Sequence, residues 1–231
     1  MKIPNLSQSA DTLVKDFGLY HFTRLSADAS LRDMASRWDA QQSRLKGRIL
    51  DLESAHAGTM TAMATRDGRV RTVADEVRAF YGTLVAKTHN NRKSPLFKTY
   101  FPDGLKAMSG VALEAETQRV SVLVNKLAQE TDPDMSAHFA PLSKSLEGLA
   151  EAVGAYRAAN ASEILAFGRI EQEKFAWLDL YKLDHRTLAQ MFYQDPKKAD
   201  SYFKPARKSK AKVTPVAPQA VHLAPSQEAT M

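Results

Sequence analysis

The sequence of 231 residues predicts an all-α fold: an elongated antiparallel helical bundle with coiled-coil-like long helices and a disordered basic C-terminal tail. Two observations indicate the bundle, because apolar residues recur every three or four positions and glycine and proline are sparse between Ala27 and Tyr193. A third indicates the tail, since five of the ten prolines lie after residue 195. We therefore divide the chain into an N-terminal segment (1–29), a helical bundle (30–195) and a flexible tail (196–231).

The N-terminal segment is expected to contain a short helix that packs on the bundle. Leu13, Val14 and Phe17 supply its apolar face, and Gly18 is expected to end it. Two longer helices follow in the prediction, at about 30–66 and 69–88. A turn at Asp67-Gly68 is expected to separate them.

A break is expected at 89–104, followed by a third helix at about 111–130 and a last helical region at 134–193. From Leu142 to Met191 this last region keeps a heptad spacing, which favours one continuous helix from about 141 to 193. The alternative is a new helix start at Asn160, since Asn160 and Glu163 have the spacing of a capping box. A continuous helix would be about 80 Å long.

The end of the last helix carries more large apolar residues than a bundle seam requires. We assign Trp177, Tyr181, Leu188 and Phe192 to a surface that binds a protein partner or a second copy of the chain. The alternative is that the N-terminal segment or the other helices cover these side chains within one chain.

The 89–104 segment combines aromatic and basic residues. Phe97, Tyr100 and Phe101 alternate with Arg92, Lys93 and Lys98, a mixture that suits an acidic partner, a lipid headgroup surface or a nucleic acid. In the alternative interpretation the three aromatic side chains fold back and cap the end of the bundle, leaving the basic residues in water.

Most of the positive charge lies in the tail. From Pro196 onward there are seven basic and two acidic residues, a net charge of +5, whereas the preceding residues carry only +1. Lys204, Arg207, Lys208, Lys210 and Lys212 form a candidate anion-binding tether for nucleic acid, an anionic membrane or an acidic protein. A merely solubilising tail is the alternative.

Few residues suggest chemistry. The sequence has no cysteine, no nucleophile-elbow serine motif and no glycine-rich phosphate or dinucleotide loop. Glu53 and His56 have the Glu-x-x-His spacing of a helical di-iron site, but such a site needs two of these motifs and the chain has one. We therefore expect no catalytic residue, no metal, no cofactor and no small-molecule substrate.

These observations predict a non-enzymatic helical scaffold or adaptor that acts through protein–protein contacts and carries a basic C-terminal tether. An anionic-surface binding module that uses the tail and the 89–104 segment is the second hypothesis. A helical metal carrier or enzyme is the third. The chain has no apolar run of the ~18 residues that span a bilayer, and residues 1–20 lack the apolar core of a signal peptide, so we expect a cytoplasmic protein.

Overall fold

The computed structural model describes residues 4–108 and 113–205, and over these residues the fold is all-α with no strand, as the sequence predicts. The elements in chain order are α1 (Ala10–Thr12), the π-helical η1 (Leu13–Gly18), α2 (Leu19–Ser26), η2 (Ala29–Leu31), α3 (Arg32–Lys87), α4 (Pro95–Tyr100), η3 (Leu105–Met108), α5 (Leu113–Leu127), α6 (Pro133–Ser136), α7 (Phe139–Met191) and α8 (Pro196–Ser201).

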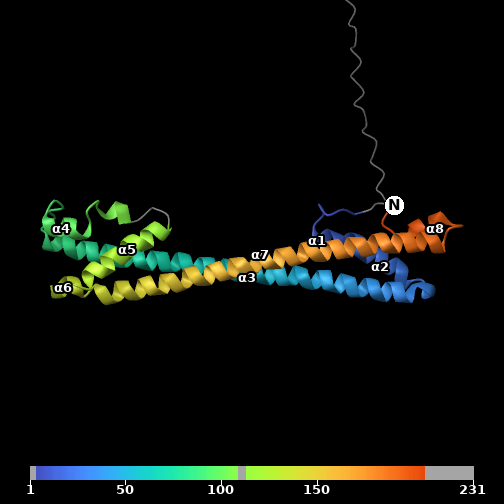
Figure 1. Cartoon of the computed structure of the whole chain (residues 1–231), viewed down its shortest axis with the longest axis horizontal. Coiled ribbons are helices and arrows are strands. Elements are labelled where there is room, and N and C mark those ends of the chain that lie inside the picture. The colour runs from blue at the N-terminus through green and yellow to red at the C-terminus, as the bar shows by residue number, and fades with distance from the viewer. Residues whose placement is uncertain (1–3, 109–112, 206–231) are drawn as a thin grey trace, which may run out of the picture.

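Two long helices, α3 with 56 residues and α7 with 53, form an antiparallel two-helix stalk along the whole molecule (Figure 1). Side-chain contacts define its register: Arg37 pairs with Asp184, His56 with Glu163 and Thr83 with His138. One residue forward in α3 thus corresponds to about one residue back in α7. At ~1.5 Å per residue each helix is about 80 Å long.

The stalk has two separate hydrophobic cores, one at each end. In the first core the N-terminal segment and α8 pack on the start of α3 and the end of α7. In the second core, the 95–108 segment and α5 pack on the end of α3 and the start of α7. The middle of the stalk lies between them, where Figure 1 shows α3 and α7 without a third helix beside them.

The N-terminal segment packs on the stalk as expected, but its helix continues through Gly18. Leu13 and Phe17 are buried in the first core, and the Trp38 indole N–H donates to the Gly18 carbonyl at 3.1 Å. A Cβ at position 18 would lie 1.8 Å from the side-chain nitrogen of Gln42. Glycine therefore serves a close approach between η1 and α3 here, and the prediction that it ends the helix is wrong.

The predicted turn at Asp67-Gly68 is also wrong, because α3 passes through it without a break. Three contacts accompany the helix at this point. The Arg66 guanidinium binds the Asp67 carboxylate and also stacks over the Tyr156 ring of α7, 4.4 Å from its centre. The Thr72 hydroxyl donates to the Gly68 carbonyl at 3.2 Å, as in a regular helical turn. The neighbouring α7 supports the backbone that an isolated Asp-Gly pair would bend.

The 89–104 segment contains a short helix, α4, where the sequence predicts only a break. α3 ends where His89 and Asn90 adopt positive φ angles of 47° and 60°. Ser94 then caps α4 by accepting from the Phe97 N–H at 3.2 Å, and Pro95 stands at its first position. The third predicted helix, 111–130, is observed as α5 over Leu113–Leu127.

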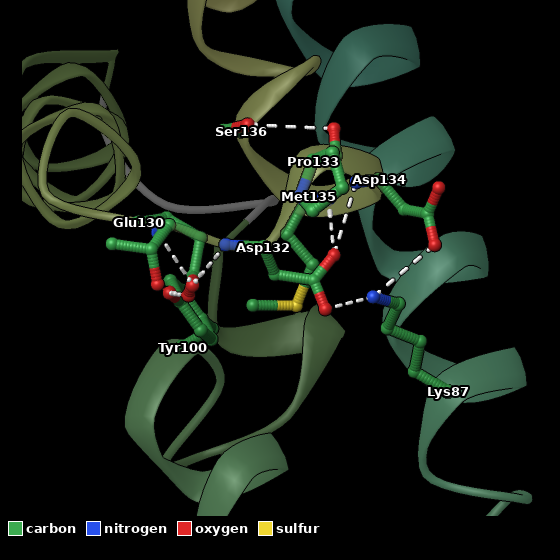
Figure 2. A network of polar contacts seen from close by, with 9 residues as sticks. Lys87, Tyr100, Glu130, Asp132, Pro133, Asp134, Met135 and Ser136 are labelled. Atoms are coloured by element: carbon green, nitrogen blue, oxygen red, sulfur yellow. Dashed lines mark hydrogen bonds and ion pairs between the residues drawn. The ribbon is translucent and has the colours of Figure 1, made fainter.

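A polar network closes this end of the stalk (Figure 2). The Asp132 carboxylate accepts from the Asp134 backbone N–H at 3.0 Å and binds the Lys87 ammonium at the end of α3. The Glu130 carboxylate accepts from the Tyr100 hydroxyl. The Lys87 ammonium holds the pKa of Asp132 below its ordinary value, and the Tyr100 hydroxyl does the same for the pKa of Glu130. These contacts fasten α4 to the loop after α5, and they fasten that loop and α6 to the end of α3.

The predicted continuity of the last helix is confirmed, since α7 runs unbroken through Asn160. The predicted start at 134 is corrected, because the separate helix α6 precedes α7. The predicted boundary of the tail is also corrected. Asp195 caps α8, and Ala199, Tyr202 and Phe203 are buried in the first core, so residues 196–203 belong to the folded body. The remainder of the predicted tail, 206–231, lies outside the described residues.

Candidate functional site

The apolar residues at the end of α7 that we assigned to a partner belong to the chain's own first core. Trp177, Tyr181 and Leu188 are 0% exposed. Trp177 stacks on Tyr181 with ring centroids 5.3 Å apart, and Phe192 stacks on Tyr202. A partner cannot reach the three fully buried side chains in this structure, so the assignment is wrong. The alternative, in which the N-terminal segment covers them, agrees with the structure.

The aromatic residues of the 89–104 segment have a similar place in the second core. Phe97, Tyr100 and Phe101 are buried, and Phe101 packs 5.8 Å from Phe80 of α3. Burial is the main cause that raises the pKa of Tyr100, with a further contribution from the Glu130 carboxylate. Their assignment to a partner surface is corrected in favour of the alternative, in which they cap the end of the bundle.

The basic residues of the same segment remain on the surface. Arg92, Lys93 and Lys98 are exposed; the Arg92 guanidinium lies 5.9 Å from the centre of the Tyr81 ring, and the Lys98 ammonium donates to the Pro102 carbonyl at 2.8 Å. In the tail, Lys204 pairs with Asp16 at 2.9 Å. The other predicted anion-binding residues, Arg207, Lys208, Lys210 and Lys212, lie outside the described residues.

A buried polar cluster fastens the C-terminal segment to the first core. The His21 Nδ1 lies 2.9 Å from the Tyr202 carbonyl, and its Nε2 lies 3.3 Å from the Asp184 carboxylate, which also binds Arg37. Because a carbonyl only accepts, Nδ1 must carry a proton. The imidazole stacks on Phe203 at 4.6 Å. His21 and Asp184 are both fully buried, which indicates a structural role rather than a site open to a ligand.

Several large apolar side chains in the middle of the stalk are not buried. Met60, Ile164 and Phe167 are each more than half exposed. A groove of about 600 Å³ opens between α3 and α7 at this point. We call it the central groove, and it is lined by Leu52, Glu53, His56, Asn160, Glu163, Ile164 and Phe167.

A polar pair lies within the central groove, where a two-helix seam ordinarily has apolar residues. The His56 Nδ1 is 2.8 Å from a Glu163 carboxylate oxygen across the two helices. The Thr59 hydroxyl first, and then the His56 imidazole, hold the pKa of Glu163 below its ordinary value. His56 thus pairs with Glu163 and not with Glu53. Over the described residues, no group of three or more side chains is arranged to hold a metal ion.

A second groove, of about 730 Å³, continues along the same side of α7 toward α5. Tyr156 and Val153 line it, while Asn160, Glu163 and Phe167 line the central groove. These five positions follow one another at spacings of three and four, which places them on one side of the helix. α5 contributes Thr117, Gln118 and Ser121 to the second groove. The central groove therefore lies on the side of α7 that α5 covers further along.

Comparison with protein-family models, with curated proteins and with solved structures gave no significant match. Among the helices of the described residues, none is long and apolar enough to cross a membrane. The site therefore rests on the geometry of this chain alone.

Sequence reasoning missed the central groove because it interpreted the heptad spacing from Leu142 to Met191, which includes Phe167, as one helix seam. A usable signal was present: Ile164, Leu165 and Phe167 occupy three of four consecutive positions, which cannot all face one neighbouring helix. In the structure Ile164 and Phe167 line the groove, whereas Leu165 does not.

Proposed function

We propose that this protein is a non-enzymatic helical scaffold or adaptor that binds a protein partner along the central groove and uses its basic tail as a tether. The exposure of Ile164 and Phe167 carries the proposal. Contiguous apolar surface on a soluble chain is typical of an interaction site, and burying it against a partner helix releases about 25 cal/mol for each Å². A groove between two helices suits an amphipathic helix.

The shape of the molecule supports a scaffold. The nearest buried residues of the two cores lie 28 residues apart along each long helix, Leu45 and Val73 on α3 and Leu149 and Trp177 on α7, and the central groove lies between them. A partner bound at the groove and another bound through the tail would contact different parts of one rod. This separation is what an adaptor requires.

A second candidate function, binding to an anionic surface, draws support from the exposure of Arg92, Lys93 and Lys98. These residues lie beside α4, at the opposite end of the stalk from α8, after which the tail begins (Figure 1). Arg92, Lys93 and Lys98 therefore cannot share one small anion with Lys204, which lies at the first core. Only a membrane or an extended polymer would contact both.

A matched pair of substitutions tests the first proposal. Ile164 and Leu165 are adjacent and equally exposed, at 63% and 62%, but only Ile164 lines the groove. Full-length protein, Ile164→Ser and Leu165→Ser are used as baits in nuclease-treated lysate, and bound proteins are quantified by mass spectrometry. We expect a partner recovered equally by the unaltered chain and Leu165→Ser, and at least ten-fold less by Ile164→Ser. Equal recovery by both variants would contradict a partner site at the groove.

The second candidate has its own test. Replacing Arg92, Lys93 and Lys98 together by glutamate should abolish sedimentation with anionic vesicles or retention by duplex DNA, and should flatten the salt dependence. Unchanged binding would remove this candidate.

A further inference from the structure

We propose that the central groove binds a single amphipathic helix of another protein, which completes a three-helix arrangement with α3 and α7. The bound helix has one apolar face and, beside that face, a basic residue that pairs with Glu53. This inference rests on the proposed function, because it names the chemistry of the partner at the same groove. Three features carry it: what covers the stalk on either side of the groove, the length of the gap, and the charges of the lining.

One row of residues on α7 passes from the second core, through the central groove, to the first core. Its members are Val153, Asn160, Phe167, Lys174 and Tyr181, which are seven residues apart and therefore lie on one side of the helix. Val153 packs against the second core, and Lys174 and Tyr181 are buried. Asn160 and Phe167, which lie between them, are exposed. The row is thus covered at both ends and open in the middle.

A helical segment of this chain covers the row at each end. At the first core, the Lys174 ammonium donates to the Leu6 carbonyl at 2.8 Å, and the centroid of the Tyr181 ring lies 6.5 Å from that of Phe17 in η1. At the other end, α5 lines the second groove together with Val153. Between these two segments, among the described residues, α3 and α7 run without a third helix beside them (Figure 1).

The facing row of α3 repeats the pattern. Gln42, Ile49, His56, Met63 and Val70 are also seven residues apart. The Gln42 side-chain amide donates to a carbonyl of η1 at 3.3 Å, Ile49 packs against the first core and Val70 packs against the second. His56 is exposed, and Met63 is 37% exposed. The opening therefore extends over both long helices.

The gap has room for one helix of limited length. Lys174 is 21 residues after Val153, which corresponds to about 30 Å along α7. A bound helix that reached from α5 to the N-terminal segment would therefore have about 20 residues. A helix suits this surface because its backbone hydrogen bonds are internal. An extended segment would need backbone partners, which α3 and α7 do not offer because their own backbones are helical here.

The lining defines the chemistry of the bound helix. The lining residues that require an apolar face are Leu52, Ile164 and Phe167. Glu163 is paired with His56, whereas Glu53 is exposed and, over the described residues, forms no ion pair. Lys15, on which the Glu53 charge acts from further away, is itself paired with Asp11 at 2.8 Å. A lysine or arginine beside the apolar face of the bound helix would therefore complement Glu53.

A second copy of the chain fits the groove less well. In a contact between two copies related by a two-fold axis, the lining of one groove would meet the same lining of the other. The seven lining residues include two glutamates and no lysine or arginine, so Glu53 would remain without a basic partner. The N-terminal segment and α5 also cover the same side of α7, so a second stalk of about 80 Å could not lie along the groove.

Synthetic helices of about 18 residues test the inference. Each fluorescein-labelled peptide has leucines at spacings of three and four, alanine and glutamine elsewhere, and one arginine, whose position beside the leucine face differs from peptide to peptide. Binding to the full chain is measured by fluorescence anisotropy. We expect at least one peptide to bind Ile164→Ser at least ten-fold more weakly than the unaltered chain. The same peptide should bind Leu165→Ser as it binds the unaltered chain, because Leu165 is equally exposed but lies outside the groove.

Two matched changes test the helix and the charge separately. A proline in the middle of the same peptide should abolish binding, because it breaks the helix. Glu53→Gln should weaken the binding of the arginine peptide several-fold and leave the binding of a peptide with glutamine in place of arginine unchanged.

The opposite results would overturn the inference. Equal binding to Ile164→Ser and to the unaltered chain, or no binding by any peptide, would show that the groove does not take a helix. Retained binding by the proline peptide would show that the occupant is not helical, and an unchanged affinity for Glu53→Gln would exclude the basic residue. A dimer in sedimentation equilibrium that Ile164→Ser dissociates and Leu165→Ser does not would identify a second copy as the occupant.

The peptide test and the lysate test fail separately. If Ile164→Ser lowers the capture of a partner but no peptide prefers the unaltered chain, the proposed function stands and the partner is not an amphipathic helix. If a peptide binds at the groove but no captured protein depends on Ile164, the proposed function fails and the helix-binding site remains.

Discussion

At the scale of single residues, the first core contains ionisable groups that most cores exclude. Asp184 is fully buried, and its carboxylate is compensated by the Arg37 guanidinium and the His21 imidazole. Removing the charge of a buried carboxylate leaves its hydrogen-bonding partners, here the buried His21 ring and the half-exposed Arg37, facing a neutral group. Asp184 therefore determines how firmly the C-terminal segment is held.

We expect Asp184→Asn to lower the free energy of unfolding by about 2–4 kcal/mol, because the amide keeps the shape of the side chain and removes its charge. Urea unfolding followed by circular dichroism measures the change. Asp179→Asn on the same helix is the control, since the Asp179 side chain is 77% exposed. It should change stability by less than about 0.5 kcal/mol. Equal midpoints for Asp184→Asn and the unaltered chain would refute a structural role for the buried carboxylate.

The Asp28 carboxylate predicts a pH dependence with a definite sign. It accepts from the Ser30 hydroxyl at 2.6 Å and from the Tyr202 hydroxyl at 2.8 Å, and these contacts lower the pKa of Asp28 to about 2. The unfolded pKa is about 3.9. Because the folded pKa is the lower one, the ionised form stabilises the fold at pH values above 3.9, and this contribution disappears as the pH falls toward 2.

Asp28→Asn should accordingly be less stable than the unaltered chain at pH 7, and the difference should shrink below about pH 4 and vanish near pH 2. Urea midpoints at pH 7, 4, 3 and 2 measure the difference. The corresponding substitution of the exposed Asp75 serves as a control and should show a smaller difference at pH 7. A difference for Asp28→Asn that is constant from pH 7 to pH 2 would be inconsistent with the Tyr202 contact.

At the scale of elements, periodicity predicted the helices well and local turn signals predicted their ends poorly. The heptad spacing from Leu142 to Met191 correctly indicated one helix, because packing on α3 repeats along its whole length. Asp67-Gly68 is an ordinary turn pair, yet α7 supports it as helix. Tertiary packing of this kind is not encoded in a four-residue window.

Two short elements were missed for a related reason. Ser94 and Pro95 are a standard helix start, and Asp195 and Pro196 repeat the pattern before α8. The apolar residues at 164, 165 and 167 indicate that some apolar side chains of α7 are exposed, but they do not locate the central groove, since its place depends on which side of α7 the helices of the two cores leave uncovered. A heptad pattern alone does not distinguish a seam residue such as Ile170 from a rim residue such as Phe167.

Gly68→Ala distinguishes a continuous helix from a turn. A Cβ at Gly68 meets no atom within 4 Å, and alanine is favoured over glycine in a helix by about 1 kcal/mol. We expect Gly68→Ala to raise the free energy of unfolding by about 0.5–1 kcal/mol in thermal or urea unfolding. Gly104→Ala should be destabilising instead, because Gly104 has a φ of +80°. If Gly68→Ala instead lowers the free energy of unfolding, the result would support a turn at Asp67-Gly68.

At the scale of the whole molecule, the two cores share only the two long helices. No residue of the first core belongs to the second, and the layer between them contains Thr59, His56 and Glu163. A substitution that destabilises one core is therefore expected to have little effect on the stability of the other. The two ends should open with different free energies.

Phe80→Ala tests this independence. The change removes a fully buried ring from the second core and should cost about 3–5 kcal/mol there. Hydrogen exchange measured by mass spectrometry should accelerate at least ten-fold in α4 and α5, with little change in α1 and α2. Leu13→Ala in the first core should give the reverse pattern. Uniform acceleration after either substitution would indicate one cooperative unit.

The constant antiparallel register of the stalk also makes its length adjustable. Trp38, Leu45, Thr59 and Phe80 face α7 at multiples of seven residues, and Leu142, Leu149, Ile170 and Trp177 do so on α7. Removing seven residues from α3 and the seven facing residues from α7 would shorten the stalk by about 10.5 Å. The residues on either side of the deletion would keep their heptad positions and would therefore still pack between the two helices. Evolution or design can thus change the spacing between the two ends in fixed increments without rebuilding either end.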